Sequence, residues 1–401
     1  MIPYADTVRN PFAVISPAHT DIAPSGGASR VYPLVAMKSN YLSHAGTHTS
    51  ACGVTAYNGG PVGENHSASV FVCEPVGNLV TRSVAQLQQT SAALIAKRAR
   101  PKADFLASKD TWFRPGSLAN GPDGAMYLAE MYRLWVEHPK FLPKDVAAKL
   151  DWRAGADRGR IWRIHPKGMQ PHKFTPPKRD ADLVALLSHE NSWQRYLGQR
   201  LLVEKQAKGV AADVRKLKTR SDKPLTRLHA MWTLDGLGQL SAEDVRHALK
   251  DEDVYVRRDA VKLAANRLKE HPEMMDQIAG LTGDAPVVRM QVALAAGATD
   301  SDLASKVLTQ VAANPVLDKW IASAILTSCK ENSATILQGM IGDGSGISPS
   351  RARLDLIQKL AGVTGMRGDV DELATALKTI TSSKRAGVWW QTAALKGLAT
   401  G

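Results

Sequence analysis

Hydrophobic and polar positions follow two different periods along the chain. Up to about residue 165, short apolar runs stand between clusters of Gly, Pro, Asn and Ser, which is typical of β-strands joined by turns. After about residue 180 the apolar positions recur at helical spacing, as at Val256, Ala260, Val261, Leu263 and Ala264. The pattern therefore predicts a multidomain β + α chain.

The first region predicts seven short strands joined by turns and longer connections. The clearest turn is Gly121-Pro122-Asp123-Gly124, where Pro presets one φ angle and Gly closes the bend. Thr111–Arg133 is therefore expected to form one β-hairpin around this turn. The expected strands are Val31–Met37, Ser50–Tyr57, Ser69–Glu74, Asn78–Ser83, Gly116–Asn120, Ala125–Ala129 and Gly159–Ile164.

Two of these hairpins share a plan, in which the second strand ends at an acidic residue, Glu74 in one and Glu130 in the other. Repetition of such a unit is typical of β-propeller blades. Only two or three blades fit into residues 1–165, so the prediction is an incomplete set of C-terminal propeller blades.

The second region carries an internal repeat. A basic residue recurs near the start of similar helices at steps of 32, 30, 32 and 30 residues, at Arg195, Arg227, Arg257, Arg289 and Lys319. Such a period predicts an α-solenoid of paired helices like HEAT or armadillo repeats. The repeated basic residue has two interpretations, a structural bridge between repeats, which is favoured, or a groove for an acidic partner.

Proline and glycine mark the limits of these helices. Pro224 and Pro286 are expected in the first turn of the second helix of a pair. Gly339–Gly346 is expected to be an insertion between repeats, and Gly387–Leu398 a last helix. The expected domains are residues 1–165 for the blades, 166–180 for a linker rich in Pro and Lys, and 181–401 for the HEAT-like α-solenoid.

Composition narrows the function classes. The 401 residues carry a net charge of +13, but Lys and Arg are spread widely without a zinc-finger spacing or basic aromatic helix, so nucleic-acid binding is not expected. No run of 18 apolar residues predicts a membrane span, and the N-terminus has no signal-peptide pattern. The three cysteines include no Cys-x-x-Cys-His haem motif.

Cys52 and Cys73 are nearly symmetric about the loop between two expected strands, which makes them cross-strand neighbours. A disulfide and two buried thiols are equally compatible with this placement. His44 and His48 are four residues apart, but a loop is expected there, so no metal site is predicted.

Charged and aromatic residues are expected to meet where the hairpins end, opposite their turns. Arginine, carboxylate and tyrosine side chains suit an anionic or polyhydroxylated ligand. For three of these residues a structural role is the alternative: Arg114 pairing with Glu130, Glu74 accepting backbone donors, and His138 as a turn residue. The candidate binding residues are His48, Glu74, Arg114, Glu130, Tyr132, Arg133 and His138.

Long segments of the first region resemble the late blades of one family, the membrane-bound dehydrogenases of planctomycete and verrucomicrobial bacteria. This family is similar to quinoprotein sugar dehydrogenases of the glucose/sorbosone type. The resemblance lies in Thr49-Ser-Ala-Cys-Gly53, Val70–Val80, Trp112-Phe-Arg-Pro115 through Tyr132-Arg133, Glu137-His-Pro139, and Asp157-Arg-Gly-Arg-Ile-Trp-Arg-Ile164.

The resemblance implies a propeller followed by HEAT-like helices, located outside the cytoplasm or in the periplasm. It implies one portion of a dehydrogenase that oxidises a sugar or alcohol with PQQ and calcium, with Arg114 and Arg133 as the analogues of quinone-binding arginines. The blades that carry the family's catalytic His are not in this sequence, so no catalytic residue is assigned. The alternative is a non-enzymatic scaffold that binds a glycan or protein, with a protein partner on the solenoid.

Overall fold

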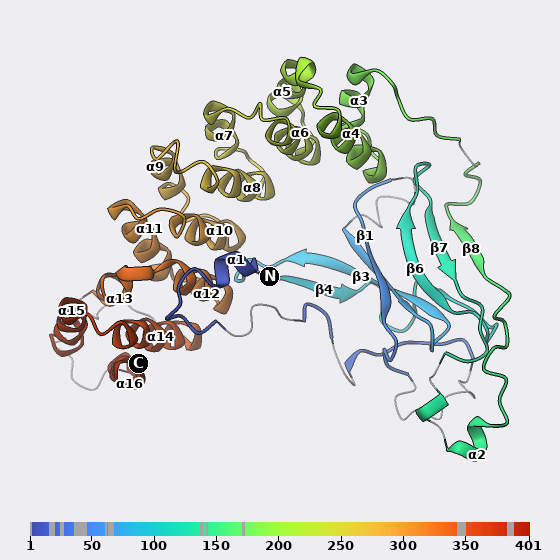
Figure 1. Cartoon of the computed structure of the whole chain (residues 1–401), viewed down its shortest axis with the longest axis horizontal. Coiled ribbons are helices and arrows are strands. Elements are labelled where there is room, and N and C mark those ends of the chain that lie inside the picture. Colours follow the sequence, from blue (N-terminus) through green and yellow to red (C-terminus); the bar gives the residue numbers. More distant parts are fainter. Residues whose placement is uncertain are drawn as a thin grey trace. The chain divides into compact units, whose positions relative to one another are not determined.

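The structure is a computed structural model that describes residues 2–15, 21–24, 28–35, 46–60, 62, 68–136, 139–141, 143–170, 173–342, 350–382 and 389–401. An antiparallel β region is followed by many consecutive helices (Figure 1). This confirms the predicted order of β and helical parts, whereas a propeller is not shown.

Two sheets make up the β region. The first has the order β1 (Cys52–Tyr57), β2 (Ser69–Glu74), β3 (Leu79–Leu87), β4 (Leu94–Arg98), with β5 (Leu106–Ala107) paired to β3. The second has the order β6 (Pro115–Asn120), β7 (Met126–Glu130), β8 (Arg160–Ile164). Six of the seven expected strands are therefore present, and β4 and β5 were not expected.

The seventh expected strand, Val31–Met37, is wrong over the part that the structure describes. Residues 31–35 form no strand, and only an isolated bridge joins Arg30 to Thr47. Two backbone features explain this: Pro33 has no amide donor, and the amide of Tyr32 donates to Asp104 Oδ2 at 2.7 Å instead of to a neighbouring strand. Residues 36 and 37 lie outside the described ranges.

The two sheets share one apolar core. Its buried side chains come from both sheets, from the β1–β2 connection and from the segment between the sheets: Tyr57, Val62, Phe71, Cys73, Val80, Phe113, Leu118, Met126 and Leu128. At Gly53 the backbone of β1 approaches β6 so closely that an added Cβ would lie 2.6 Å from the Gly116 carbonyl oxygen. Gly53 also has a φ of +58°, so glycine is required here for two reasons.

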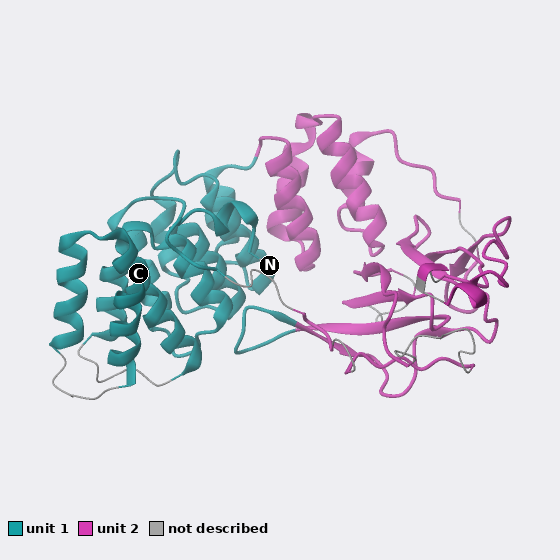
Figure 2. Cartoon of the chain, turned by 60° about the horizontal axis from the view of Figure 1, so that its bottom comes forward, with its two compact units in different colours: residues 1–20, 87–94, 240–401 teal, residues 21–86, 95–239 magenta. Residues whose placement is uncertain are grey.

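Three short helices lie outside the helical series: α1 (Tyr4–Thr7) before the sheets, and η3 (Pro139–Phe141) and α2 (Lys144–Ala147) between β7 and β8. The other helices follow β8 in a regular series. Figure 2 colours the two compact units into which the chain divides, residues 1–20, 87–94 and 240–401 in one, and residues 21–86 and 95–239 in the other. The sheets belong to the second unit together with α3 (Asp180–Leu186), α4 (Ser192–Glu204), η4 (Lys208–Val210), α5 (Ala211–Arg220) and α6 (Pro224–Gly236).

The remaining helices belong to the first unit. Within it, α8, α10, α12, α14 and α16 pack one on the next, and α9, α11, α13 and α15 form a second row. Their bounds are α7 (Ala242–Ala248), α8 (Val254–Ala265), α9 (Met274–Ala279), α10 (Pro286–Ala296), α11 (Asp302–Ala313), α12 (Lys319–Ser328), η5 (Lys330–Asn332), α13 (Ser333–Ile341), α14 (Arg351–Arg367), α15 (Val370–Thr381) and α16 (Trp389–Thr400). This is a helical-repeat arrangement.

Most of the helix ends that the sequence predicted are found in the structure. Pro224 and Pro286 open α6 and α10, and α16 lies where a last helix was expected. The expected insertion at Gly339–Gly346 is wrong at its start, because α13 continues to Ile341 to bury Leu337, Met340 and Ile341. Residues 343–346 lie outside the described ranges.

The repeated basic residue is structural wherever it is arginine. Each of four arginines donates to the loop carbonyl five or six residues before it: Arg195 to His189 and Glu190, Arg227 to Ser221, Arg257 to Asp251 and Glu252, and Arg289 to Asp284. Two of them also reach the next repeat, Arg257 at the Asp284 carboxylate (2.6 and 2.7 Å) and Arg289 at the Val316 carbonyl (2.6 Å). These bonds join each of the four helices to its own loop, and two of them also join it to the following repeat.

The chain's first residues and the β3–β4 hairpin tip belong to the same unit as the later helices. Asp318 caps α12 with Oδ1, which accepts from Trp320 N and Ile321 N, while Oδ2 accepts from Ser91 Oγ (2.5 Å) and Ala92 N (2.8 Å). Asn10 Nδ2 donates to the Leu326 carbonyl at 2.9 Å. One carboxylate thus fixes both a helix start and a hairpin tip.

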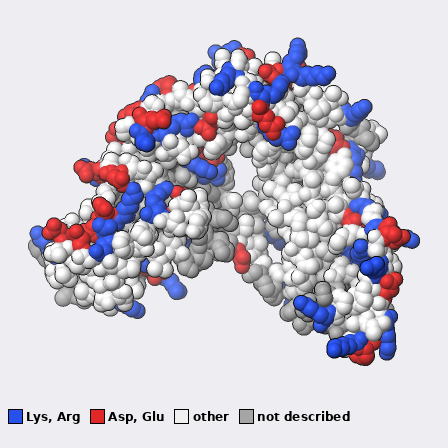
Figure 3. All heavy atoms as spheres, in the orientation of Figure 1, with Lys and Arg blue, Asp and Glu red and all other residues white. Residues whose placement is uncertain are grey.

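Among the described residues, no helix combines the length and the apolar character needed to cross a membrane. On the face drawn in Figure 3, basic and acidic side chains are interspersed rather than gathered into one positive area.

The arginine bonds predict a strong effect of replacing Arg289 with Ala. The guanidinium is buried, and its removal leaves the Asp284 and Val316 carbonyls without this donor, so the free energy of unfolding should fall by about 3 kcal/mol. Urea denaturation followed by circular dichroism measures it.

Lys319→Ala is the matched control, since Lys319 occupies the same repeat position but places its ammonium 5.0 Å from the Trp320 ring centroid. Its loss should cost less than about 1 kcal/mol. Equal effects of the two substitutions would contradict the structural role of the repeated arginine.

Candidate functional site

The strand ends that were expected to meet lie at one end of the two sheets. Pro115 pairs with Glu130, the Met131 amide donates to the Arg114 carbonyl at 3.0 Å, and Arg114 Nη1 donates to the Pro75 carbonyl at 2.9 Å. The ends of β2, β6 and β7 are therefore brought together as predicted. We call this group, Glu74, Pro75, Arg114 and Glu130, the strand-end cluster.

Glu74 is fully buried and holds the segment before β1. Its carboxylate accepts from the Thr49 and Ser50 amides, from both of their hydroxyls, and from His48 Nδ1, at 2.9 to 3.2 Å. Burial raises the pKa of this carboxyl, but the hydrogen bonds from His48 and Ser50 outweigh it and leave the pKa below its ordinary value. The structure thus brings His48 and Glu74 together, and Glu74 satisfies backbone donors, as the structural alternative proposed.

Arg114 is also buried, with 1% of its surface exposed. Its guanidinium donates to three backbone carbonyls, those of Arg133 (2.9 Å), Pro75 (2.9 Å) and Leu134 (2.6 Å). A planar guanidinium with five donors is suited to such divergent acceptors. Arg114 therefore joins the end of β2 to the segment after β7.

Glu130 pairs with Arg160 across the β7–β8 ladder. The two residues are register partners, and Arg160 Nε and Nη2 donate to the carboxylate at 2.9 and 2.8 Å. Trp162 Nε1 also donates to it, at 2.5 Å. The sequence pattern missed Arg160 and Trp162, although the i, i+2 alternation of a strand beside Glu130 was a usable signal.

Tyr132 lies beneath the same arginine. The Arg160 guanidinium carbon is 4.1 Å from the Tyr132 ring centroid and 5.0 Å from that of Trp162. Tyr132 has a φ of +53°, an uncommon conformation for a residue with a side chain. The hydrogen bonds that Arg160 donates to Glu130 raise the pKa of the Arg160 guanidinium.

Arg133 and His138 are the two remaining candidate binding residues. Arg133 contributes its backbone to the strand-end cluster, but its Nη1 is buried and without a hydrogen-bond partner among the described residues. His138 lies outside the described residues. Asn78, with a φ of +56°, donates to the carbonyls of Thr111 and Phe113 and closes the same end of the sheets.

The two cysteines are cross-strand neighbours, as expected. Cys52 and Cys73 are register partners in β1 and β2, and both are free thiols in the structure. Burial raises the pKa of the Cys73 thiol to about 12 and also raises that of Cys52, so neither forms a thiolate readily.

The residues of the strand-end cluster do not fit the quinone and calcium site that the family resemblance implies. The Arg114 donors expected to hold an anionic quinone point to three backbone carbonyls, and the oxygens of Glu74 accept five groups. Among the described residues, no group of three or more His, Cys, Asp or Glu is placed to hold a metal ion. We therefore derive no step through PQQ or calcium.

Comparisons with known proteins give little more. Residues 1–168 match a family model described as a domain of unknown function (DUF7133). No curated protein matches the chain. The X-ray structure of YibA from Escherichia coli is 18% identical, covers 58% of this chain and 100% of its own, and has a TM-score of 0.32, too low to support a conclusion.

Because folding lowers the pKa of Glu74, we expect the free energy of unfolding to fall in acid. A carboxyl whose pKa is lowered on folding stabilises the fold above its unfolded value of about 4.5, and this contribution disappears as the pH falls through the folded value. Glu74→Gln should lose about 2 kcal/mol or more at pH 7, because an amide cannot accept all five groups.

Thermal unfolding of both proteins from pH 7 to pH 3 tests this. The difference between wild type and Glu74→Gln should shrink at low pH, whereas the exposed Glu204→Gln should change little throughout. A constant difference across the whole range would contradict an ionised Glu74.

Replacing Arg114 should destabilise the fold much more than replacing Arg133. Arg114→Ala leaves three carbonyls without their donor and should lower the free energy of unfolding by about 3 kcal/mol or more. Arg133→Met keeps the apolar stem, removes an unpaired buried nitrogen, and should change it by less than about 1 kcal/mol. Chemical denaturation measures both changes, and an Arg114→Ala protein as stable as the wild type would contradict the structural role of this guanidinium.

Proposed function

We propose that this chain is a non-enzymatic binding scaffold with a protein partner on its helical repeats. The observation that carries the proposal is that the polar side chains at the strand ends are occupied by bonds within the chain. Glu74 and Arg114 are buried, and together they accept from or donate to eight groups. Side chains used in this way hold strands together and are not available to a substrate.

The architecture fits the same proposal. We infer that the two sheets are propeller blades and that the helices form a HEAT-like α-solenoid, in which each repeat contacts mainly its neighbours. Such arrays offer extended surfaces on which macromolecules bind. The dehydrogenase interpretation and the extracytoplasmic location remain predictions from resemblance.

The proposed binding surface for the protein partner is centred on α15, which carries two exposed apolar side chains on one side. Val370 and Leu377 are seven residues apart on α15, which places them on the same side of the helix, and they are 78% and 47% exposed. Leu395 of α16 is 49% exposed. Exposed large apolar side chains of this kind are typical of protein interfaces when they lie close together.

The test compares two leucines with the same exposure. Leu377 and Leu225 are both 47% exposed on helices, α15 and α6. A partner is first isolated by cross-linking to the wild-type chain in an extract of the source organism and is then purified. Leu377→Glu should weaken its affinity at least about tenfold, and Leu225→Glu should leave the affinity within about twofold.

Failure to recover a partner, or equal binding by the two variants, would contradict the protein-binding role. A second arm supplies PQQ, calcium and a panel of sugars and alcohols with a redox dye. Dye reduction above the rate without protein would overturn the non-enzymatic part of the proposal.

A further inference from the structure

The connection between β4 and β5 begins with a strongly basic run. In Lys97-Arg-Ala-Arg-Pro-Lys102, four of the six residues carry a positive charge. Arg98 is used inside the fold, because its guanidinium pairs with the buried carboxylate of Asp104. The other three side chains make no hydrogen bond or ion pair with the described residues: Lys97, Arg100 and Lys102.

A small cavity of about 80 Å³ lies between β3 and this connection, and we call it the β4–β5 cavity. Its lining consists of Arg82, Ala99, Arg100, Ala103 and Phe105. Of these described residues two are arginines and none is acidic. The volume is far below the roughly 300–1,000 Å³ of pockets for drug-sized ligands, so the cavity suits one small anionic group.

Backbone bonds hold both ends of the connection against β3. The Ala99 amide donates to the Arg82 carbonyl at 3.0 Å, and the Phe105 amide donates to the Val80 carbonyl at 3.0 Å. The Phe105 ring also packs edge to face on Phe71 of the core, with ring centroids 4.7 Å apart. The walls of the β4–β5 cavity are therefore fixed by the sheet and its core.

The two arginines of the cavity repel one another. Burial, and after it the positive charge of Arg100, lowers the pKa of the Arg82 guanidinium. Arg82 Nε donates to Ser69 Oγ at 2.9 Å, and this neutral hydroxyl orients the guanidinium without offsetting its charge. Two like charges at one cavity are unfavourable until an anion lies between them, and an anion of two charges matches both guanidinium groups.

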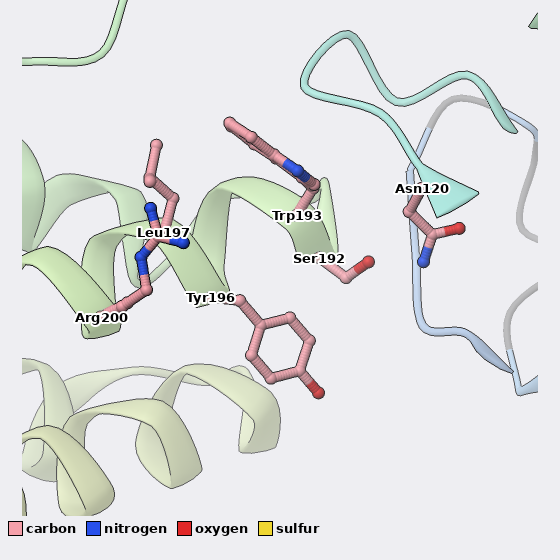
Figure 4. Close-up of a pocket in the computed structure, with 6 residues that line it drawn as sticks. All are labelled: Asn120, Ser192, Trp193, Tyr196, Leu197 and Arg200. Carbon is pink, nitrogen blue, oxygen red and sulfur yellow. The ribbon is translucent and has the colours of Figure 1, made fainter. Parts of the chain in front are cut away.

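A larger cavity of about 250 Å³ beside the first turns of α4 is less suited to an anion. Figure 4 shows the residues that line it: Asn120, Ser192, Trp193, Tyr196, Leu197 and Arg200. Arg200 is the one charged residue of this described lining, and its Nε lies 3.5 Å from Glu204 Oε1. The unpaired atoms Ser192 Oγ and Asn120 Oδ1 are buried, so a ligand does not reach them.

We propose that the β4–β5 cavity binds one phosphate group between Arg82 and Arg100, as inorganic phosphate or as the monoester of a larger molecule. A phosphate monoester carries a charge of about −1.5 to −2 at pH 7 and three strong acceptor oxygens, which suit the planar fork of a guanidinium. A carboxylate brings one charge, and a neutral ligand leaves the repulsion between the arginines in place. The site does not depend on the proposed protein-binding role, because it lies in the other compact unit.

The test is a titration of the ¹⁵N-labelled full chain with inorganic phosphate, glucose 6-phosphate and acetate at constant ionic strength, followed by NMR. Phosphate or glucose 6-phosphate should shift the amide signals of Arg82, Ala99 and Arg100 saturably, with a dissociation constant of about 10 mM or less. Acetate should bind at least about tenfold more weakly. Tighter binding of glucose 6-phosphate than of phosphate identifies a phosphorylated molecule as the source, and equal or weaker binding identifies the free anion.

Variants of the basic run separate a built site from a basic surface. Arg100→Ala should weaken phosphate binding at least about tenfold, and Arg100→Lys about threefold, because lysine keeps the charge without the planar fork. Arg100 is exposed, so both variants should remain folded, which circular dichroism checks. Lys97→Ala is the matched control, since it removes an exposed, unpaired cation of the same run outside the cavity lining, and it should keep the affinity within about twofold.

Three results would overturn the phosphate site. The first is the lack of saturable binding up to about 50 mM phosphate or glucose 6-phosphate. The second is acetate binding as tightly as phosphate. The third is an equal loss of affinity in Lys97→Ala and Arg100→Ala, which is the behaviour of a basic surface that attracts anions without a defined site.

Discussion

The need to pair buried backbone carbonyls governs both parts of this molecule. Loops that join strands or helices leave carbonyl oxygens outside the regular ladders, and burying such an oxygen without a donor is costly. Arginine provides the donors in each part, Arg114 at the strand ends and Arg195, Arg289 and their equivalents in the helical repeats. A guanidinium can serve two or three carbonyls in different directions, which the single ammonium of lysine does less well.

Carboxylates perform the complementary task for backbone amides. Glu74 accepts from two consecutive amides before β1, and Asp318 accepts from two amides of α12 and one of the hairpin tip. The charges of Glu74 and Asp318 are thus used for internal pairing. The strand-end cluster consequently behaves as a structural joint, and binding is better assigned to residues that have not been used in this way.

The sequence predicted what depends on periodicity and on local turn chemistry. The β6–β7 hairpin follows from its Pro-Asp-Gly turn, the pairing of Cys52 with Cys73 from symmetry about a loop, and the helix pairs from the spacing of Arg195 to Lys319. It did not predict the direction in which side chains point. Arg114 turns inward to carbonyls of residues 19 and 20 positions later, and no local pattern encodes these partners. The strand predicted at residues 31–35 is absent for the same reason, because the amide of Tyr32 donates to the carboxylate of the distant residue Asp104.

The junction between α4 and the sheets was equally hidden from the sequence pattern, because its bonds join residues 70 and 137 positions apart. In two later repeats the arginine at this position, Arg257 or Arg289, serves its own loop and the following repeat. Arg195 keeps the bonds to its own loop but directs Nη2 to Asn58 of the β region. The first repeat thus contacts a loop of the β region instead of another helix pair. The arginine position that ties a helix to its own loop therefore also builds the junction between two unlike architectures, without any departure from the packing rule of the other repeats.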